Sequence, residues 1–368
     1  MMTDFDMTES PIEEYLRKFC ECDGVSGYEH EGEDCIANLI IEKIRPYCDE
    51  AYIDRAGNII ALKKGRASGG QKLLFAAHMD EVGFAVKYIN DDGTLLFDDI
   101  GISPSAMPCR YVRIGERKVP GIIGMTPVHL VSRAEREKPV SADSLYIDIG
   151  AKSREEAEKL VSLGDCAAFG GEYEFLSERR VRSKAIDDRI GCAILCRLIA
   201  ESTAHKNDIY FAFTVGEELG TLGACAAANE IKPDLVFVVE ATTASDIPGC
   251  EGRDRVCSLG MGAAVPTMDG GTSYDKALGE SVRLLAKENG VAVQNKLKVA
   301  GGTDARTFQR ASGGARVLGL ALPCRYIHTA SCVADVGDMR ELERLVRLIA
   351  RKFGDGEPDV RTFEGKAE

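Results

Sequence analysis

Four short apolar runs, each long enough for one strand, place the strongest constraint on how this 368-residue chain can fold. Polar residues do not alternate with apolar ones in these runs, a pattern typical of strands buried on both faces of a parallel sheet. The runs are 72–77, 210–215, 236–239 and 317–322, and segments with helical spacing of apolar residues are 11–22, 32–47, 187–200, 223–230, 274–289, 304–311 and 338–353. This alternation predicts an α/β domain whose central, mostly parallel sheet is covered by helices on both faces.

Residues 82–176 show a different pattern of apolar and turn-forming residues. Short β-like segments follow one another there, separated by turns rich in Gly, Pro and Asp, with one helical segment at 153–163. We expect a small β-rich module, residues 81–176, inserted between the two parts, 1–80 and 177–368, of the α/β domain.

Composition narrows the range of partners and locations. The formal net charge is −13, from 46 Lys and Arg against 59 Asp and Glu, which argues against nucleic acid or an anionic membrane as the main partner. The acidic N-terminal segment lacks the apolar stretch of a signal peptide, and no apolar run approaches the roughly 18 residues of a membrane span. Several of the thirteen cysteines sit in apolar helical runs, so we expect buried free thiols and a cytoplasmic protein.

Ionisable residues follow the predicted strands at the point where each strand ends. They are His78, Asp80, Glu217, Glu218, Glu240 and His328. In open α/β sheets ligands bind at this edge, so these side chains are expected to converge. So many charged groups in one crevice would be costly unless a cation neutralised them, and a divalent metal is the natural candidate. Of the two adjacent glutamates, one could bind metal while the other handles the proton of a bound water.

Each signal also has a simpler interpretation when taken alone. A histidine after a strand is often structural, because polar residues usually find partners. Asp187 could merely cap the helix that follows it, and His328 could be an exposed loop residue. Thr303 and Asp304 follow two glycines and precede a helix, so they form either a turn with an N-cap or a loop that contacts substrate.

An ordered set of motifs carries a family resemblance from about Gly24 to Lys352. The motifs are AHMDEVG (77–83), KAIDDR (184–189), VGEELG (215–220), VEATT (239–243), GGTDA (301–305) and RYIHT (325–329). Each is short, but together they are highly specific. The chain resembles the tetrahedral aminopeptidase, or glutamyl aminopeptidase, family of dinuclear zinc metallopeptidases.

The resemblance implies a phosphorylase/hydrolase-like catalytic domain with an inserted PDZ-like β-barrel used for dimerisation. It also implies hydrolysis of short peptides from their N-termini. Proteins of this family commonly assemble into tetrahedral dodecamers built from dimers, so the expected partners are peptide substrates and further copies of the chain.

The resemblance further implies two divalent metal ions per subunit, zinc or cobalt, and the ligand types also suit manganese. Asp187 would bridge both ions, Glu218 and His328 would complete one site, and His78 and Glu240 the other. Glu217 would be the general base, and Asp80 would orient His78. Two departures stand out: Glu240 replaces the Asp of many relatives, and Thr329-Ala330 replaces a more usual Ser/Thr-Pro.

The resulting hypothesis is hydrolysis of the N-terminal peptide bond by a metal-bridged water, with Glu217 as the group that takes its proton. The alternatives are another metal-dependent amidohydrolase, or an endoglucanase, a name that some relatives carry. Glycosidases need two carboxylates and no metal, which leaves His78 and His328 without a role. A scaffold that has lost catalysis is a further alternative, although the full ligand set is present.

Overall fold

The computed structural model describes residues 11–67, 70–127, 129–132, 137–201 and 205–356. Only the last residues of the acidic N-terminal segment fall within these ranges, and most of the polar C-terminal segment lies outside them. No helix in the described ranges combines the length and the apolar character that a membrane crossing requires.

Four parallel strands form the centre of the large sheet, in the spatial order β12 (Asp208–Thr214), β3 (Lys72–His78), β13 (Leu235–Thr243) and β16 (Arg316–Arg325). Antiparallel strands extend it on both sides. They are β1 (Glu50–Ile53) and β2 (Ile59–Lys63) beside β12, and β17 (Cys332–Asp335), β11 (Arg180–Ser183) and β10 (Glu174–Phe175) beside β16. Two further strands, β14 (Ala263–Val265) and β15 (Val293–Asn295), attach through β16.

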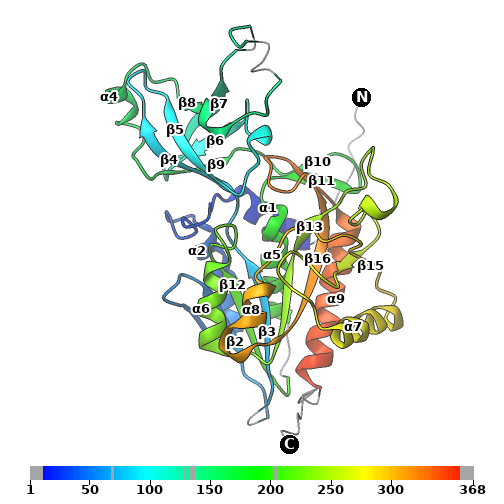
Figure 1. The fold of residues 1–368 in the computed structure, drawn as a ribbon. Coiled ribbons are helices and arrows are strands. Elements are labelled where there is room, and N and C mark those ends of the chain that lie inside the picture. The colour runs from blue at the N-terminus through cyan, green and yellow to red at the C-terminus, as the bar shows by residue number, and fades with distance from the viewer. Residues whose placement is uncertain (1–10, 68–69, 128, 133–136, 202–204, 357–368) are drawn as a thin grey trace, which may run out of the picture.

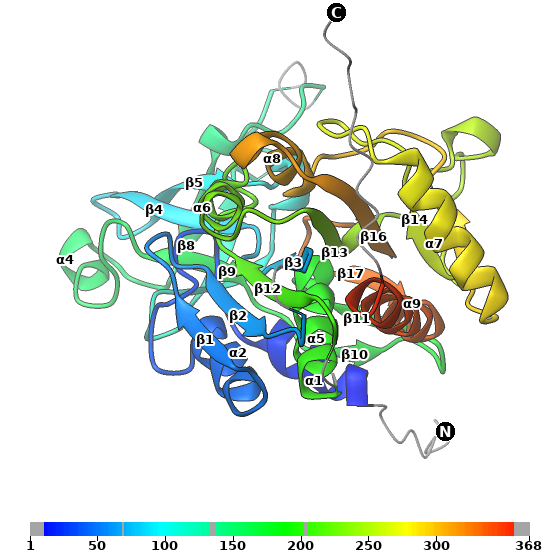
Figure 2. The same ribbon diagram turned by 90° about the horizontal axis from the view of Figure 1, so that it is seen from below.

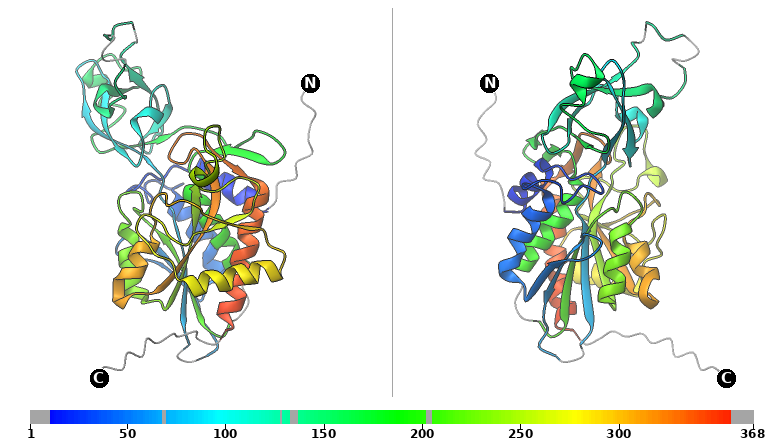
Figure 3. Two further views of the ribbon diagram at one scale, coloured as in Figure 1. Left: turned by 45° about the vertical axis from the view of Figure 1, so that its right-hand side comes forward. Right: turned by 90° about the vertical axis from the view of Figure 1, so that its left-hand side faces the viewer.

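Helices cover both faces of this sheet, as Figure 2 and Figure 3 show. One face carries α1 (Pro11–Glu21), α2 (Ile36–Ile44), α5 (Ile186–Glu201) and α9 (Val336–Gly354). The other carries α6 (Leu222–Ile231) and α8 (Ala305–Arg310), while α7 (Lys276–Glu288) lies on the side of β14. The ring of Phe75 stacks between those of Phe211 and Phe237 at centroid distances of 5.9 and 5.4 Å, which shows how the apolar runs fill the core.

A closed barrel rises from one end of the α/β domain (Figure 1). Its strands follow the order β4 (Gly83–Ile89), β5 (Leu95–Ile100), β8 (Leu145–Asp148), β7 (Val119–Met125), β6 (Tyr111–Ile114) and β9 (Cys166–Phe169). Closure leaves no unpaired strand edge. Phe84 fills the interior, in edge-to-face contact with Phe97 and Phe169 at 5.0 and 5.2 Å between ring centroids.

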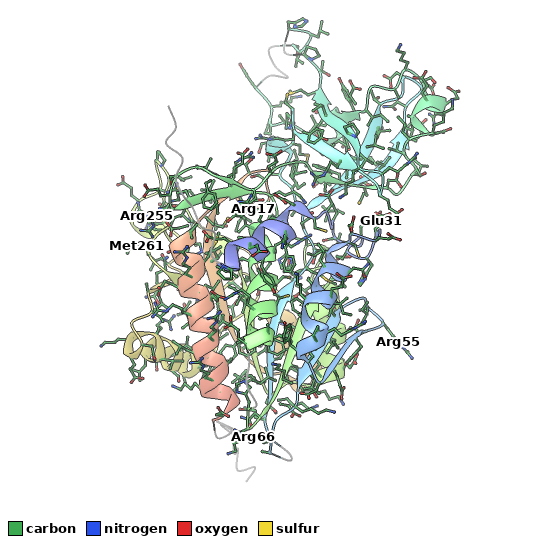
Figure 4. The ribbon with its side chains drawn as sticks, turned by 180° about the vertical axis from the view of Figure 1, so that it is seen from behind. Arg17, Glu31, Arg55, Arg66, Arg255 and Met261 are labelled. Atoms are coloured by element: carbon green, nitrogen blue, oxygen red, sulfur yellow. The ribbon has the colours of Figure 1, made fainter. Side chains whose placement is uncertain are left out.

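Ion pairs join the barrel to the α/β domain. Asp23 follows α1 and accepts a hydrogen bond from Arg113 Nε on β6 at 2.8 Å, and Lys184 Nζ lies 3.0 Å from the same carboxylate. Figure 4 shows the helical face in front, with Glu31 beside the barrel. There the Cys166 thiol on β9 lies 3.4 Å from the Glu31 carboxylate. Charged side chains of the α/β domain, Asp23 and Glu31, therefore contact the barrel at two places.

The predicted fold class is confirmed: the sheet is parallel at its centre, and a closed antiparallel barrel interrupts the α/β domain. The limits 81–176 for the inserted module stay a prediction. All thirteen cysteines are free, and nine of them are buried.

Several element boundaries were wrong. The helix expected at 153–163 is a single turn, α4 (Arg154–Ala157). Beyond it Val161 is buried, but Leu160 and Leu163 are exposed, so no continuous apolar face extends the helix. The helix expected at 32–47 begins at Ile36 and ends in a 3₁₀ turn, Arg45–Tyr47. Strand β13 continues to Thr243 instead of ending at 239, so Glu240 lies inside it. Strand β9 was not expected, although all four of its residues are buried.

Candidate metal centre and active site

The ionisable residues singled out in the sequence gather at the carboxyl ends of the four parallel strands, at the edge that faces the barrel (Figure 1). His78 is the last residue of β3 and pairs in register with Thr214, the last residue of β12. Glu217 and Glu218 follow in the loop after β12, and His328 lies in the loop after β16. Because the central strands are parallel, their ends meet at one edge although they are far apart in sequence.

A cavity of about 510 Å³ opens at this edge. Seven of the predicted site residues line it together with loops from both sides. The lining comprises His78, Gly101, Ser103, Ala106, Asp187, Glu217, Glu218, Glu240, Ala241, Thr242, Thr243, Lys296, Ala300, Gly301, Gly302, Thr303, Tyr326, Ile327, His328 and Thr329. Gly101 to Ala106 follow the barrel strand β5, so the barrel forms part of the cavity wall.

Asp187 lies between two histidines, with one carboxylate oxygen facing each. Its Oδ1 is 3.3 Å from His78 Nε2, and its Oδ2 is 3.7 Å from His328 Nε2. His328 Nε2 is also 3.1 Å from Glu218 Oε1. One carboxylate flanked by two imidazoles is the arrangement that a ligand shared by two cations requires.

Two aspartates hold His78 in place. Its Nδ1 is 3.4 Å from Asp80 Oδ1 and 3.2 Å from the Asp80 carbonyl oxygen. Its peptide N–H donates to Asp188 Oδ2 at 3.2 Å, and Asp188 also accepts from Gly191 N at 2.9 Å. A hydrogen bond at Nδ1 sets the tautomer and leaves Nε2 free to bind a cation.

Asp80 also holds the loop that carries the two glutamates. Its two oxygens accept from the peptide N–H groups of Glu217 and Glu218, both at 3.1 Å, and one also accepts from the Ser26 hydroxyl. A single buried carboxylate therefore positions His78, Glu217 and Glu218 together. No local pattern in the sequence pointed to Ser26, and Asp188 stood out there only as the neighbour of Asp187.

Burial makes this cavity electrostatically costly without a cation. It raises the pKa of Glu217 to about 9, with Asp304 and Glu218 adding to the effect. Burial likewise raises the pKa of Glu218 and raises that of Glu240 well above its usual value. These shifts mean that too little positive charge surrounds the carboxylates to stabilise their ionised forms.

The pKa values of the two histidines are also raised, which favours their charged forms. Burial favours their neutral forms, but hydrogen bonds to Asp187 and Asp80 outweigh it and raise the pKa of His78 well above its usual value. Asp187 and Glu218 likewise raise the pKa of His328 to about 11 against the effect of burial. Each imidazole thus takes the place of a cation in stabilising the acids around it.

Two groups of side chains have ligand atoms within 4.8 Å of one another, the spacing expected of a metal site. They are His78 with Glu217 and Glu218, and Asp187 with Glu218 and His328. Glu240 belongs to neither group, although it lines the same cavity. A mixture of imidazole and carboxylate donors fits zinc, cobalt or manganese.

Thr303 and Asp304 occupy different positions. Thr303 lines the cavity, whereas Asp304 is buried behind it and is not part of its lining. Asp304 Oδ2 accepts from the Thr214 hydroxyl at 2.5 Å, and its Oδ1 has no hydrogen-bond partner among the described residues. The substrate-binding role expected for both residues stays a prediction.

The family model described as M42 glutamyl aminopeptidase matches residues 57–345. The chain belongs to this family. The match includes every predicted metal ligand and Glu217, and it confirms the resemblance found in the sequence. The M42 chain is accordingly an aminopeptidase, a hydrolase of peptide bonds.

Individual relatives support this membership. The chain is 33% identical to the lysyl aminopeptidase of Pyrococcus furiosus, over 92% of this chain and 97% of that protein. It is similar to the structure of aminopeptidase APDkam598 from Desulfurococcus kamchatkensis, with a TM-score of 0.87, 31% identity and coverage of 94% and 95%. It also resembles the TET1 peptidase of Pyrococcus horikoshii, which can assemble into a tetrahedron or a large octahedral shell, with a TM-score of 0.80, 32% identity and coverage of 93% and 99%.

Proposed function

We propose that this M42 chain is a dinuclear metallo-aminopeptidase that releases the first residue of short peptides. The observation that carries the proposal is the position of Asp187 between His78 and His328, 3.3 and 3.7 Å from their Nε2 atoms. Glu218 and His328 would complete one cation site with Asp187. His78 and Glu240 would complete the other.

The chemistry of the donors supports two divalent cations, zinc or cobalt, with manganese as a further candidate. Three glutamates with raised pKa values line one cavity, and cations would favour their ionised forms. When bound, such ions polarise the scissile carbonyl and make water more acidic. Glu240 is the least supported ligand, because no ligand atom of it belongs to either close group.

Glu217 is proposed as the proton carrier. Its side chain lines the cavity, and its peptide N–H is anchored on Asp80, which holds the residue in place. The carboxylate would take a proton from the attacking water and deliver it to the amine that leaves as the peptide bond breaks. Asp80 does not line the cavity, so its proposed role is to position His78, Glu217 and Glu218.

Further copies of the chain are the proposed partners. The TET1 peptidase, which can assemble into a tetrahedron or a large octahedral shell, supports assembly of many copies into one particle. The proposed particle is a tetrahedral dodecamer built from dimers that meet through the barrel. A sizing measurement should give a particle of twelve 39.8-kDa chains. A cytoplasmic location remains a prediction from the thiol-rich composition.

The decisive experiment uses aminoacyl anilides with the full-length chain, first treated with chelator and then reloaded with zinc or cobalt. Hydrolysis should disappear with the metal and return on reloading, and N-acetylated anilides should resist cleavage. Chelator-resistant hydrolysis would exclude the metal mechanism. Chelator-resistant cleavage of a β-glucan without any anilide hydrolysis would favour the endoglucanase alternative.

A further inference from the structure

The barrel contributes to the wall of the metal centre through the loop that follows strand β5. Gly101 is the first residue of this loop, and it lines the cavity together with Ser103 and Ala106. The other described residues of the lining belong to the α/β domain. Gly101 adjoins two of the proposed metal ligands, His328 and Glu218, and each contact has a physical consequence.

The carbonyl group of Gly101 orients His328. His328 Nδ1 lies 2.8 Å from this carbonyl oxygen. A carbonyl oxygen only accepts hydrogen bonds, so Nδ1 carries the proton and Nε2 is left to bind a cation. Nε2 is also the atom that faces Asp187 and Glu218.

The absence of a side chain at Gly101 makes room for Glu218. The backbone there has a φ of +73°, a conformation that residues with side chains rarely adopt. A Cβ added at Gly101 would lie 3.1 Å from Glu218 Oε2 and 2.8 Å from Val82 Cγ1. The other oxygen of Glu218, Oε1, lies 3.1 Å from His328 Nε2. The Glu218 carboxylate therefore lies between His328 and the bare backbone of the barrel loop.

The two histidines of the metal centre receive their support from different parts of the molecule. His78 Nδ1 lies 3.2 Å from the carbonyl oxygen of Asp80 and 3.4 Å from its carboxylate, and all of these groups belong to the α/β domain. His328 receives the equivalent contact from the barrel. A group that orients a metal-binding histidine in this way is typically worth about 10- to 100-fold in metal affinity.

From this arrangement we infer that Gly101 is a positioning residue for one of the two cation sites, the one completed by Glu218 and His328. Its carbonyl sets the tautomer of His328, and its lack of a side chain leaves space for the Glu218 carboxylate. The inference rests on the proposed dinuclear function and gives the barrel a part in it. The barrel supports this site, whereas the site of His78 and Glu240 is supported from the α/β domain.

The test measures zinc binding to the full-length chain by equilibrium dialysis, which does not depend on activity. The wild type should bind two zinc ions per chain. Gly101→Ala should lower the affinity for one of them by about 10- to 100-fold and leave the affinity for the other unchanged. The added methyl group would displace the Glu218 carboxylate, and the strained backbone would move the carbonyl group away from His328.

Two further variants show which site is weakened. His78→Ala leaves the site of Glu218 and His328 as the stronger one, and adding Gly101→Ala should lower its zinc affinity by the same factor. His328→Ala leaves the other site as the stronger one. Adding Gly101→Ala to that variant should change the zinc affinity little.

Gly150→Ala is the matched control for backbone strain. Gly150 also lies in the inserted barrel module and has a φ of +77°, but a Cβ added there would meet no atom within 4 Å. This variant should lose stability and keep wild-type affinity at both sites. The double variant Gly101→Ala with Val82→Ala removes the crowding against Val82 and leaves the contact with Glu218, so it should show the same loss of affinity in a barrel with less strain.

Unchanged zinc affinity in Gly101→Ala and in the double variant would overturn the inference. A loss of equal size at both sites would overturn it too, since it would mean that Gly101 only keeps the barrel folded. A wild type that binds fewer than two zinc ions per chain would instead overturn the proposed dinuclear function, and the inference with it.

Discussion

The α/β domain and the barrel bury different kinds of side chain. At the strand ends of the α/β domain, Asp80 and Asp188 are completely buried, and His78 and Glu240 nearly so. Between Glu81 and Ser183, which spans the barrel, the described residues include no polar or charged side chain that is buried. The barrel core is apolar throughout, as in Phe84, Val112 and Ile147. The α/β domain therefore bears the energetic cost of buried charge at its strand ends, whereas the barrel is stabilised by an apolar core.

The two regions nevertheless meet at one proposed metal ligand. His328 Nδ1 forms a hydrogen bond of 2.8 Å with the Gly101 carbonyl oxygen, which directly follows barrel strand β5. His328 itself is 37% exposed, so this bond is what orients its ring from the solvent side. The comparison predicts that changes at the strand ends affect catalysis with little loss of stability. Changes in the barrel core should do the reverse.

The largest effect is expected at Glu217. Replacing it with Gln should lower kcat by about 10²- to 10⁴-fold, because a positioned acid–base group contributes that much. The amide keeps the shape of the side chain, so bound metal and the thermal unfolding temperature should change little. Activity assays, metal analysis and calorimetry check these points, with Glu42→Gln, a change at an exposed side chain of α2, as the control. Near-normal turnover in Glu217→Gln would remove it from the mechanism.

At Phe84 we expect the reverse, a loss of stability with little loss of catalysis. Phe84→Ala removes the ring that packs on Phe97 and Phe169, and it should lower the free energy of unfolding by about 3–5 kcal/mol. Phe84→Leu should cost less, because it leaves a smaller cavity. Molecules that remain folded should keep their metal and most of their kcat, measured below the unfolding transition. Loss of metal in step with loss of stability would mean that the two regions are not separable.

The sequence predicted the centre of the sheet well because its strands are buried on both faces. Runs such as 72–77 have no polar alternation, and the residue directly after that run is the proposed metal ligand His78. It missed the shortest strands on the β16 side of the sheet. Strands β10, β14 and β15 have two or three residues each, and their pairing is set by the neighbours they meet in space.

The candidate site, too, could be predicted only in part. The family motifs pointed to the groups that line the cavity, since four of them lie at the carboxyl end of a central strand. They did not reveal the contacts behind those groups, such as the Ser26 hydroxyl on Asp80 or the His78 N–H on Asp188. These bonds span 54 and 110 residues of sequence. A single chain offers no local pattern from which such distant partners could be found.

The smallest effect is expected where the two regions join, at Asp23. Burial opposes its charge, but Lys184 and Arg113 outweigh burial and lower the pKa of Asp23 to about 2. In the unfolded chain it would titrate near its ordinary value of about 3.9. The charged carboxylate therefore contributes on the order of 2 kcal/mol of stability above about pH 5, and this is lost as the pH falls from about 4 towards 2.

Asp23→Asn should thus lower the free energy of unfolding at pH 6, and the difference from wild type should shrink as the solution becomes more acidic. Urea unfolding at a series of pH values measures it, and metal loss in acid affects both proteins alike. Asp34→Asn, an exposed change nearby, should stay within about 0.5 kcal/mol of wild type at every pH. A difference that does not depend on pH would mean that Asp23 joins the barrel to the α/β domain by its shape and hydrogen bonds, not by its charge.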